Sequence, residues 1–431
     1  MRAPAQRPTT PDTRERAALV GLFSGPSRQF DPEHSLDELA GLTAAAGATV
    51  VLRVLQERPR PDPATFLGSG KVQTLAASCD EVGAGVVVFD NELTPAQLRN
   101  LERALDRKVV DRTQLILDIF ARRARTREGK LQVELAQLKY LLPRLVGAHA
   151  ALSRLGGGIG TRGPGETKLE TDRRRLRHRI SMLSKDIDAV RRRRSQLRDR
   201  RQKASVPTVA LVGYTNAGKT TLFNALTGNA AAASNALFVT LDPLVRKVRL
   251  PDRRELLVSD TVGFIERLPH SLVAAFRATL EEVAAADLLL HVVDASNPDR
   301  ERQMEAVRQV LAEVDADRVP ALDVFNKCDQ LDPAERERLR AIYPGALCVS
   351  ALTGEGRDEL IAAVESRLAL DTTRVTFEFD SASDADRAQI SQLYRVGRIL
   401  RHASSDGHIS IDVELPRRVL DRFGSAVAQG S

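Results

Sequence analysis

The feature that most constrains this chain is a glycine loop between an apolar run and a helical pattern. The apolar run is Val209–Val212, and the helical pattern begins at Thr221. Between them stands Gly213-Tyr214-Thr215-Asn216-Ala217-Gly218-Lys219-Thr220, which has the spacing G-x-x-x-x-G-K-T. A strand, a glycine loop and a helix in this order predict a P-loop, and with it a domain built on a mostly parallel sheet.

Each position of the loop has a physical reason. Gly213 and Gly218 let the backbone turn tightly, so that consecutive N–H groups point at a phosphate. The helix that follows adds the positive end of its dipole. We expect Lys219 to reach the β- and γ-phosphates and the Thr220 hydroxyl to ligate magnesium. All residues from Gly213 to Thr221 are therefore candidates for nucleotide binding.

A P-loop alone does not choose between ATP and GTP, and four further segments make that choice. They are Asp260-Thr261-Val262-Gly263, Asn326-Lys327-Cys328-Asp329, Ser350-Ala351-Leu352 and Phe238-Val239-Thr240-Leu241-Asp242. We expect Asp260 to hold magnesium through water, and the Gly263 N–H to sense the γ-phosphate. Thr240 would place a second hydroxyl on the metal. Lys219, Thr240 and Gly263 are the catalytic candidates.

The guanine base is expected to be read by the later two segments. Asp329 can accept hydrogen bonds from the guanine N1–H and 2-amino group, which adenine does not offer, so adenine would leave the carboxylate unpaired. Asn326 and Lys327 would brace the loops and cover the base. Ser350 to Leu352 would offer backbone to the guanine O6. Five elements in this order predict a GTPase with GTP, GDP and Mg²⁺ as ligands, rather than an ATPase.

The residue after Gly263 is Phe264, where many small GTPases keep a glutamine that orients the attacking water. An apolar side chain cannot orient water by hydrogen bonding. We therefore expect slow intrinsic hydrolysis, with the missing element coming from a partner or from loop rearrangement. His270, just beyond, is interpreted as a surface loop residue.

The region before the nucleotide domain predicts a hairpin of two helices. Apolar residues recur in steps of three and four on either side of a loop that holds six glycines between Gly156 and Gly165. The two series are Leu131, Leu135, Leu138, Leu142 and Leu145, and then Leu176, Ile180, Leu183, Ile187, Val190 and Leu197. Thr167 and Glu170 have capping-box spacing and predict the restart of the helix, and Pro143 should kink the first arm. Two helices packed separately on a globular core are the alternative.

The second arm is strongly basic. Between Arg173 and Lys203 there are fourteen Lys or Arg residues, against Asp186, Asp188 and Asp199 and no Glu. This excess predicts a clamp on a phosphate backbone, whereas the alternative is a solvated coiled-coil face. The net charge of +7 agrees with an anionic partner such as nucleic acid.

Composition and the remaining patterns give the domain plan. We expect a polar leader over residues 1–16, a small α/β domain over 17–110, the hairpin over 111–203, the GTPase domain over 204–370 and an α+β domain over 371–431. Expected strands include Ala18–Leu22, Ala48–Leu52, Val86–Phe89, Val375–Phe379 and His408–Val413. Expected helices include Glu38–Ala46, Pro95–Leu105 with Thr94 as N-cap, Ala385–Arg401 and Pro416–Phe423. Gly68–Lys71 lacks the first glycine of a P-loop and is interpreted as a turn.

Three cysteines without paired spacing argue against a zinc site or a disulfide framework. No run of about 18 apolar residues predicts a membrane span, and the first 16 residues lack the apolar core of a signal peptide. These patterns predict a cytoplasmic protein, which we expect to be monomeric when free.

Three further runs resemble the HflX family of GTPases: Asp111-Arg112-Thr113 through Phe120, Arg122 through Leu145, and the glycine loop from Gly158 to Arg174. The resemblance implies a ribosome-associated GTPase that binds the large subunit, with the helical arm reaching toward the peptidyl-transferase region. Several members are linked to splitting or rescuing stalled ribosomes under stress. Leu244-Val245 departs from the threonines that the family usually has there. A ribosome-assembly GTPase and a protein-binding signalling switch are the alternatives.

Overall fold

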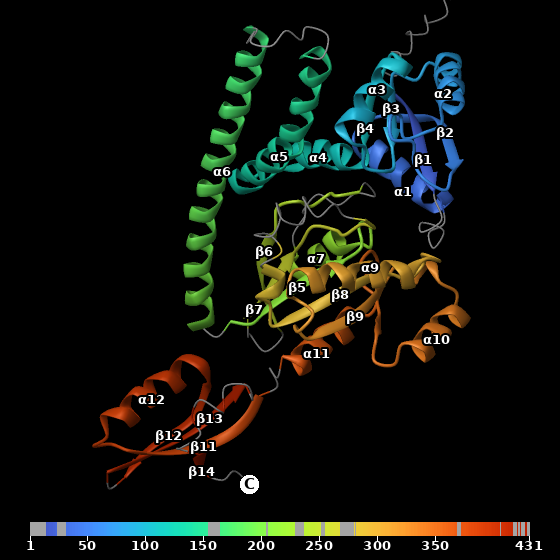
Figure 1. Cartoon of the computed structure of the whole chain (residues 1–431). Helices are drawn as coiled ribbons and strands as arrows, with labels where there is room; N and C mark the ends of the chain where they lie inside the picture. Colours follow the sequence, from blue (N-terminus) through green and yellow to red (C-terminus); the bar gives the residue numbers. More distant parts are fainter. Residues whose placement is uncertain are drawn as a thin grey trace, which may run out of the picture. The chain divides into compact units, whose positions relative to one another are not determined.

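The computed structural model divides the chain into two compact units (Figure 1). The first comprises residues 1–194, 232–243 and 265–279, and the second comprises residues 195–231, 244–264 and 280–431. The structure describes residues 14–23, 32–153, 164–203, 206–228, 237–250, 255–267, 280, 282–368, 372–405, 407–416, 420, 423 and 427–428. The expected glycine-rich tip, most of the polar leader and His270 lie outside these residues.

The first unit begins with a four-stranded parallel sheet in the order β2-β1-β3-β4. Its strands are β1 (Arg16–Phe23), β2 (Thr49–Glu57), β3 (Val86–Phe89) and β4 (Lys108–Asp111). The helices that accompany them are α1 (Pro32–Ala45), α2 (Ser69–Val82), α3 (Pro95–Leu105) and α4 (Arg112–Arg123). Side chains alternate between the two faces of each strand, and α2 and α3 pack on the face that carries Val20, Val87 and Val109. This arrangement confirms the expected α/β domain.

Local capping signals were good predictors in this domain, and one loop interpretation was wrong. Helix α3 spans the predicted residues, and its capping box forms between Thr94 and Gln97. Gly68–Lys71 is not a turn, because α2 begins at Ser69 with Gly68 as its extended N-cap. Helix α1 starts at Pro32, six residues before the expected start at Glu38, because proline suits the first turn of a helix.

Two long helices form the expected antiparallel hairpin. They are α5 (Arg127–Ser153), which bends along its length (Figure 1), and α6 (Pro164–Lys203). Their shared core is Leu135, Leu183 and Ile187, with Leu131, Leu138 and Ile180 packed against it. Glu134 and Arg179 add a bidentate ion pair across the seam at 2.7 and 2.9 Å. The predicted pairing of the arms is confirmed over this stretch.

The second arm starts earlier than its capping signal suggested. Helix α6 begins at Pro164, so Thr167 lies inside the helix and is not its N-cap. Proline has a fixed φ that suits the first helical position. Pro143 lies inside α5. A proline at such a position has no N–H to donate, so α5 lacks one of its backbone hydrogen bonds there.

The second unit contains a six-stranded sheet in the order β10-β9-β8-β5-β7-β6. All pairs are parallel except β6 with β7. The strands are β5 (Thr208–Gly213), β6 (Leu244–Arg249), β7 (Glu255–Asp260), β8 (Leu288–Asp294), β9 (Ala321–Asn326) and β10 (Leu347–Cys348). The helices are α7 (Lys219–Thr227), α9 (Arg300–Glu313), α10 (Pro333–Ile342) and α11 (Arg357–Arg367), with a 3₁₀ turn η2 (Cys328–Gln330). The edge strand β6 was not predicted, because its sequence Leu-Val-Arg-Lys-Val-Arg contains no continuous apolar run and only Val248 is buried.

The C-terminal residues form a small α+β fold with an antiparallel sheet in the order β12-β13-β11-β14. Its elements are β11 (Thr372–Asp380), α12 (Asp384–Val396), β12 (Arg398–Ser405), β13 (His408–Pro416) and β14 (Val427–Ala428). Leu393 of α12 packs against Phe377 and Phe379 of β11. The predicted fold class is therefore confirmed in all of its parts.

One helix prediction in this region was wrong, and a second falls mostly outside the described residues. Ala385–Arg401 is not one helix, because α12 ends at Val396, Gly397 follows, and Arg398–Arg401 pair with β13. Glycine is a poor residue for a helix interior and a common one after its end. Pro416 ends β13, so the predicted helix does not start there. Leu420 is helical, and most of the other residues up to Phe423 lie outside the described part. Among the described helices, none combines the length and apolar character that a bilayer span requires.

Candidate nucleotide-binding site

The P-loop connects β5 to α7, and its backbone takes the conformations that a phosphate cradle needs. Gly213 has a φ of 150° and Gly218 a φ of 92°, and Asn216 between them is left-handed at 61°. A Cβ at Gly213 would overlap the Val292 carbonyl oxygen, and one at Gly218 would overlap the Asn326 amide. Glycine is therefore required at both ends of the loop, for backbone angle and for space.

Lys219 is buried at the start of α7, with its amine inside the loop. Its Nζ donates to the carbonyl oxygens of Gly213 at 3.1 Å and Tyr214 at 2.8 Å. Burial lowers the pKa of Lys219 from 10.5 to about 8, and the nearby Asp260 carboxylate offsets only part of that effect. A cation in this position is poorly solvated by water, so an anionic phosphate would stabilise its charged form strongly.

Thr220 and Asp260 bring two hard oxygen donors together. The Thr220 hydroxyl donates to Asp260 Oδ2 at 2.8 Å, and Asp260 is fully buried at the end of β7. No group of three or more His, Cys, Asp or Glu side chains that could hold a metal occurs in the described part of the chain. Magnesium bound by one or two protein oxygens, phosphate and water needs no such cluster. The donor set fits Mg²⁺ that arrives with a nucleotide.

The segment Asp260–Gly263 lies directly against the P-loop. The Thr261 hydroxyl donates to the Leu211 carbonyl oxygen at 2.6 Å, which ties the segment to β5. A Cβ at Gly263 would lie 2.8 Å from the Thr215 Cα and 3.0 Å from the Lys219 Nζ. Only glycine lets this backbone approach the lysine so closely.

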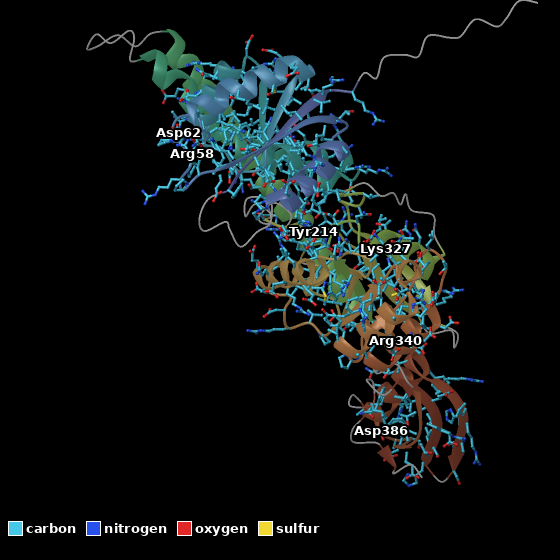
Figure 2. The ribbon with its side chains drawn as sticks, turned by 90° about the vertical axis from the view of Figure 1, so that its right-hand side faces the viewer. Arg58, Asp62, Tyr214, Lys327, Arg340 and Asp386 are labelled. Atoms are coloured by element: carbon cyan, nitrogen blue, oxygen red, sulfur yellow. The ribbon has the colours of Figure 1, made fainter. Side chains whose placement is uncertain are left out.

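Phe264 is completely buried, and its backbone pairs with the P-loop. Its N–H donates to the Gly213 carbonyl oxygen at 3.1 Å, and its own carbonyl oxygen accepts from the Thr215 N–H at 2.7 Å. These two bonds form a parallel bridge between Phe264 and Tyr214, which is labelled in Figure 2. The side chain that replaces the usual glutamine is thus part of the core.

Asn326, at the end of β9, joins two of the predicted segments. Its Nδ2 donates to the Ala217 carbonyl oxygen at 2.9 Å, and its Oδ1 accepts from the Ala351 N–H at 2.9 Å. The side chain is almost fully buried. It holds the P-loop and the loop of Ser350 to Leu352 in one arrangement, as its predicted bracing role requires.

Asp294, which sequence reasoning missed, supports the base-binding loop. Lys327, which is labelled in Figure 2, has a left-handed φ of 65°. Its Nζ donates to Asp294 Oδ2 at 2.5 Å. Asp294 ends β8, the strand next to β9, and its other oxygen accepts from the Ser296 hydroxyl. A carboxylate at the end of the neighbouring parallel strand was the available sequence signal, because parallel strands end at one edge of a sheet.

The remaining base-side residues differ in exposure. Asp329 is exposed, in the 3₁₀ turn that follows Lys327. Cys328 is buried, its thiol donates to the Phe325 carbonyl oxygen, and burial raises its pKa to about 12. Leu352 is 80% exposed, and Ser350 accepts the Thr353 N–H. The buried thiol of Cys328 is therefore not available to a ligand, and this residue could contact a nucleotide only through its backbone.

The segment Phe238–Asp242 belongs to the first unit. Phe238 packs edge-to-face on Phe120 of α4, with ring centroids 4.8 Å apart, and Leu241 is also buried. The Asp242 carboxylate accepts from the backbone N–H groups of Arg125 and Thr126. Sequence reasoning placed Asp242 among the nucleotide-binding candidates and missed this connection to the start of α5.

The residues after Phe264 also join the first unit, through a buried ionic network. Asp90 accepts from Arg112 at 2.8 Å and from Arg267 at 2.7 Å, and the Ser35 hydroxyl binds it at 2.7 Å. Arg112 also donates to the Glu266 carbonyl oxygen at 3.0 Å. Burial alone would raise the pKa of Asp90, but the two guanidinium groups outweigh it and hold that pKa below its usual value. Sequence reasoning did not find this network, whose members are far apart in the chain.

A parallel sheet with this P-loop, the Asp260–Gly263 segment beside it and Asn326 bracing both loops define a P-loop GTPase. Family models agree along the chain: "GTP-binding GTPase N-terminal" matches residues 33–121, "GTP-binding GTPase Middle Region" residues 123–201 and "50S ribosome-binding GTPase" residues 208–327.

The particular family follows from curated relatives. "GTPase HflX" of Caldanaerobacter subterraneus subsp. tengcongensis is 46% identical over 95% of this chain and 93% of its own length. "GTPase HflX" of Escherichia coli (strain K12) is 45% identical over 94% of each. The chain belongs to the HflX family of GTPases, and it binds guanine nucleotides and hydrolyses GTP.

A solved structure of a GTP-binding protein from Sulfolobus solfataricus in complex with GDP is also similar, with 25% identity and a TM-score of 0.43, over 83% of this chain and 99% of that one. The assignment to the family rests on the sequence relatives alone.

Proposed function

We propose that this GTPase binds the large ribosomal subunit in its GTP-bound form, contacts ribosomal RNA through α6, and splits or rescues stalled ribosomes under stress. The observation that carries the proposal is the charge of α6. Arg174, Arg177, Lys185, Arg192 and Arg193 are exposed and have no acidic partner within 4 Å among the described residues. Unpaired cations along one helix favour a phosphate backbone over a protein partner. Residues 208–327 match the family described as "50S ribosome-binding GTPase", and this match supports the large ribosomal subunit as the source of that RNA.

At the nucleotide, we propose a role for each segment. Lys219 contacts the β- and γ-phosphates, Thr220 and Asp260 hold the metal directly and through water, and Thr240 adds a second hydroxyl. Magnesium, when bound, neutralises charge on the phosphates. The Gly263 N–H donates to the γ-phosphate.

The base-side roles follow the same reasoning. Asp329 accepts from the guanine N1–H and 2-amino group, while Lys327, held by Asp294, covers the base. The backbone around Ala351 faces the guanine O6, and Asn326 keeps that loop in register with the P-loop. In this proposal the P-loop provides most of the affinity for the nucleotide phosphates, and Asp329 provides the specificity for guanine.

Hydrolysis is slow until a partner completes the site. Phe264 is buried and apolar, so it cannot hold the attacking water by hydrogen bonding. We assign the missing contribution to the ribosome, which would also couple hydrolysis to release. Because ribosomes are in the cytoplasm, we also assign the protein to the cytoplasm.

Sedimentation tests the proposal. Purified protein loaded with GDP or with a non-hydrolysable GTP analogue is centrifuged with mature large subunits, with 70S ribosomes and with immature large-subunit particles. The proposal requires co-sedimentation with mature large subunits that is several-fold greater with the analogue. A preference for immature particles would instead assign the protein to subunit assembly. Binding that is equal with both nucleotides, or absent, would reject a nucleotide-controlled ribosome factor.

A further inference from the structure

Asp242 lies two residues after Thr240, and its carboxylate binds the two residues that directly precede α5. Oδ2 accepts the backbone N–H groups of Arg125 and Thr126, each at 2.8 Å. Oδ1 accepts the Thr126 hydroxyl, and the same Thr126 oxygen accepts the Gly129 N–H at 3.0 Å. Three donors at the start of α5 thus converge on one carboxylate from a distant part of the chain.

The start of α5 is shaped to receive this carboxylate. The first N–H groups of a helix have no partner inside the helix, and its dipole favours a negative charge there. Gly129 lies in the first turn, and a Cβ at this position would overlap Asp242 Oδ1. Glycine is unfavourable inside a helix by comparison with alanine. Its presence here is explained by the approach of Asp242.

The loop that carries Asp242 is bound to the same unit at a second place. Phe238 packs on Phe120, and a Cβ at Gly41 of α1 would lie only 3.0 Å from Leu237. Thr240 is therefore flanked on both sides by residues that pack against α1, α4 and the start of α5 within the first unit. A shift of Thr240 cannot leave these contacts unchanged.

Helix α5 is anchored again further along. Arg144 donates to Asp111 Oδ2 at 3.0 Å and to the Leu93 carbonyl oxygen at 3.1 Å, and it lies 3.3 Å from the centre of the Tyr140 ring. From Thr126 to Tyr140 the helix rises about 20 Å at 1.5 Å per residue. The helical segment between the two anchors has the Asp242 contact at one end and the Arg144 contacts, next to Pro143, at the other.

We propose that Asp242 is a positioning residue that transmits the nucleotide-dependent movement of the Thr240 loop to α5 and so to the hairpin. The proposal rests on the role given to Thr240 above, because Thr240 is the point at which the nucleotide acts on this loop. It adds a physical connection between the guanine nucleotide and the RNA-binding arm. When Thr240 moves, the carboxylate moves with it, and Arg125 and Thr126 at the start of α5 either follow or lose their hydrogen bonds to Asp242.

Hydrogen exchange on the full chain, without ribosomes, tests this connection. The protein is loaded with Mg²⁺ and either GDP or a non-hydrolysable GTP analogue, and exchange is followed in peptides that cover Lys130–Leu135. For the wild type we expect at least a threefold difference in exchange rate between the two nucleotides. In Asp242→Ala the difference should fall below about 1.5-fold.

Gly129→Ala distinguishes transmission of the nucleotide state through Asp242 from a role of Asp242 in helix stability alone. The substitution raises helix propensity, so a purely structural role predicts slower exchange and an unchanged nucleotide difference. The proposal predicts that the added Cβ displaces the carboxylate and removes the nucleotide difference. In the double variant Asp242→Ala/Gly129→Ala, the second change should have no further effect on that difference. Asp317→Asn, at an exposed aspartate of the second unit, is the matched control and should behave as wild type.

Two results would overturn the proposal. One is equal exchange with both nucleotides in the wild type, and the other is a nucleotide difference that persists in Asp242→Ala and Gly129→Ala. Because no ribosome is present, the outcome is independent of the sedimentation test. A wild-type exchange difference together with nucleotide-independent ribosome binding would support the connection and reject the proposed function.

Discussion

The Asn326 side-chain amide nitrogen lies 2.9 Å from the Ala217 carbonyl oxygen, inside the P-loop. The other half of the same amide accepts from the Ala351 N–H. The two loops that this side chain joins are 134 residues apart in sequence (351 − 217). One buried amide therefore holds the phosphate side and the base side of the nucleotide site in register.

Asn326→Ala should destabilise the site and weaken GDP binding. The change leaves a buried carbonyl and a buried N–H without their partner, which costs about 1–3 kcal/mol in the free energy of unfolding. We expect GDP affinity to fall roughly tenfold or more, as about 1.4 kcal/mol corresponds to tenfold. Urea unfolding and fluorescent-nucleotide titration measure the two effects. Gln330→Ala, at an exposed position nearby, should change neither.

Lys219 makes nucleotide binding dependent on pH. Its pKa of about 8 leaves half of the amines neutral at pH 8 in the free protein. Phosphate favours the charged amine, so GDP binding at pH 8 should take up about half a proton. Affinity should fall as the pH rises above 8, by at most about tenfold per pH unit. Calorimetry in two buffers of different ionisation enthalpy measures the uptake.

Lys219→Arg is the control for that titration. A guanidinium stays charged throughout this range, so the variant should take up no proton even where its affinity is lower. Equal proton uptake by the wild type and the variant would show that another group titrates.

Asp294→Asn should loosen the base-binding loop while guanine specificity is kept. The amide bonds Lys327 more weakly than the carboxylate does, because the charge-assisted bond is the stronger kind. We expect GDP to dissociate about three- to tenfold faster, with an unchanged preference for guanine over xanthine. Stopped-flow release of labelled GDP gives the rate. Ser296→Ala removes only the hydroxyl that binds the other Asp294 oxygen, and should have a much smaller effect.

The nucleotide site could be predicted in large part from the sequence because its signals are local. The P-loop and the Asp260 and Asn326 segments are short runs, each placed at the end of a strand by the apolar residues before it. The connections of Asp242 and Arg267 could not be found in this way. Each depends on a partner in another element, and no spacing within one segment encodes such a contact.

The fold shows the same division between local and distant signals. Helix α3 was predicted to the residue, because Thr94 and Pro95 mark its start. The stretch Arg398–Arg401 was assigned to a helix from its pattern, but pairing with β13 makes it a strand. Tertiary pairing overrides a weak local preference, and Gly397 was the signal for the boundary.

Asp329→Asn should change the preferred base. The asparagine amide places an N–H donor where the aspartate carboxylate accepts from the guanine 2-amino group. Xanthine has an oxygen in place of that amino group, and this oxygen can accept the hydrogen bond from the asparagine N–H. We expect at least a hundredfold loss of GDP affinity and tight binding of xanthosine diphosphate. Competition titration with both nucleotides measures the switch. Retained preference for GDP would contradict the assignment of Asp329 to the base.

Replacing two exposed arginines of α6 should reduce the salt dependence of ribosome binding. Arg192 and Arg193 lie on the arm with unpaired positive charge, and each phosphate contact contributes about 0.7–0.9 to the slope of log K against log salt. Arg192→Ala/Arg193→Ala should therefore lower that slope by about 1.4–1.8 and weaken binding most at low salt. The double variant Arg338→Ala/Arg340→Ala removes the same charge from exposed positions of α10 (Arg340 is labelled in Figure 2). It should keep the wild-type slope. If both variants lower the slope equally, net charge and not α6 attracts the RNA.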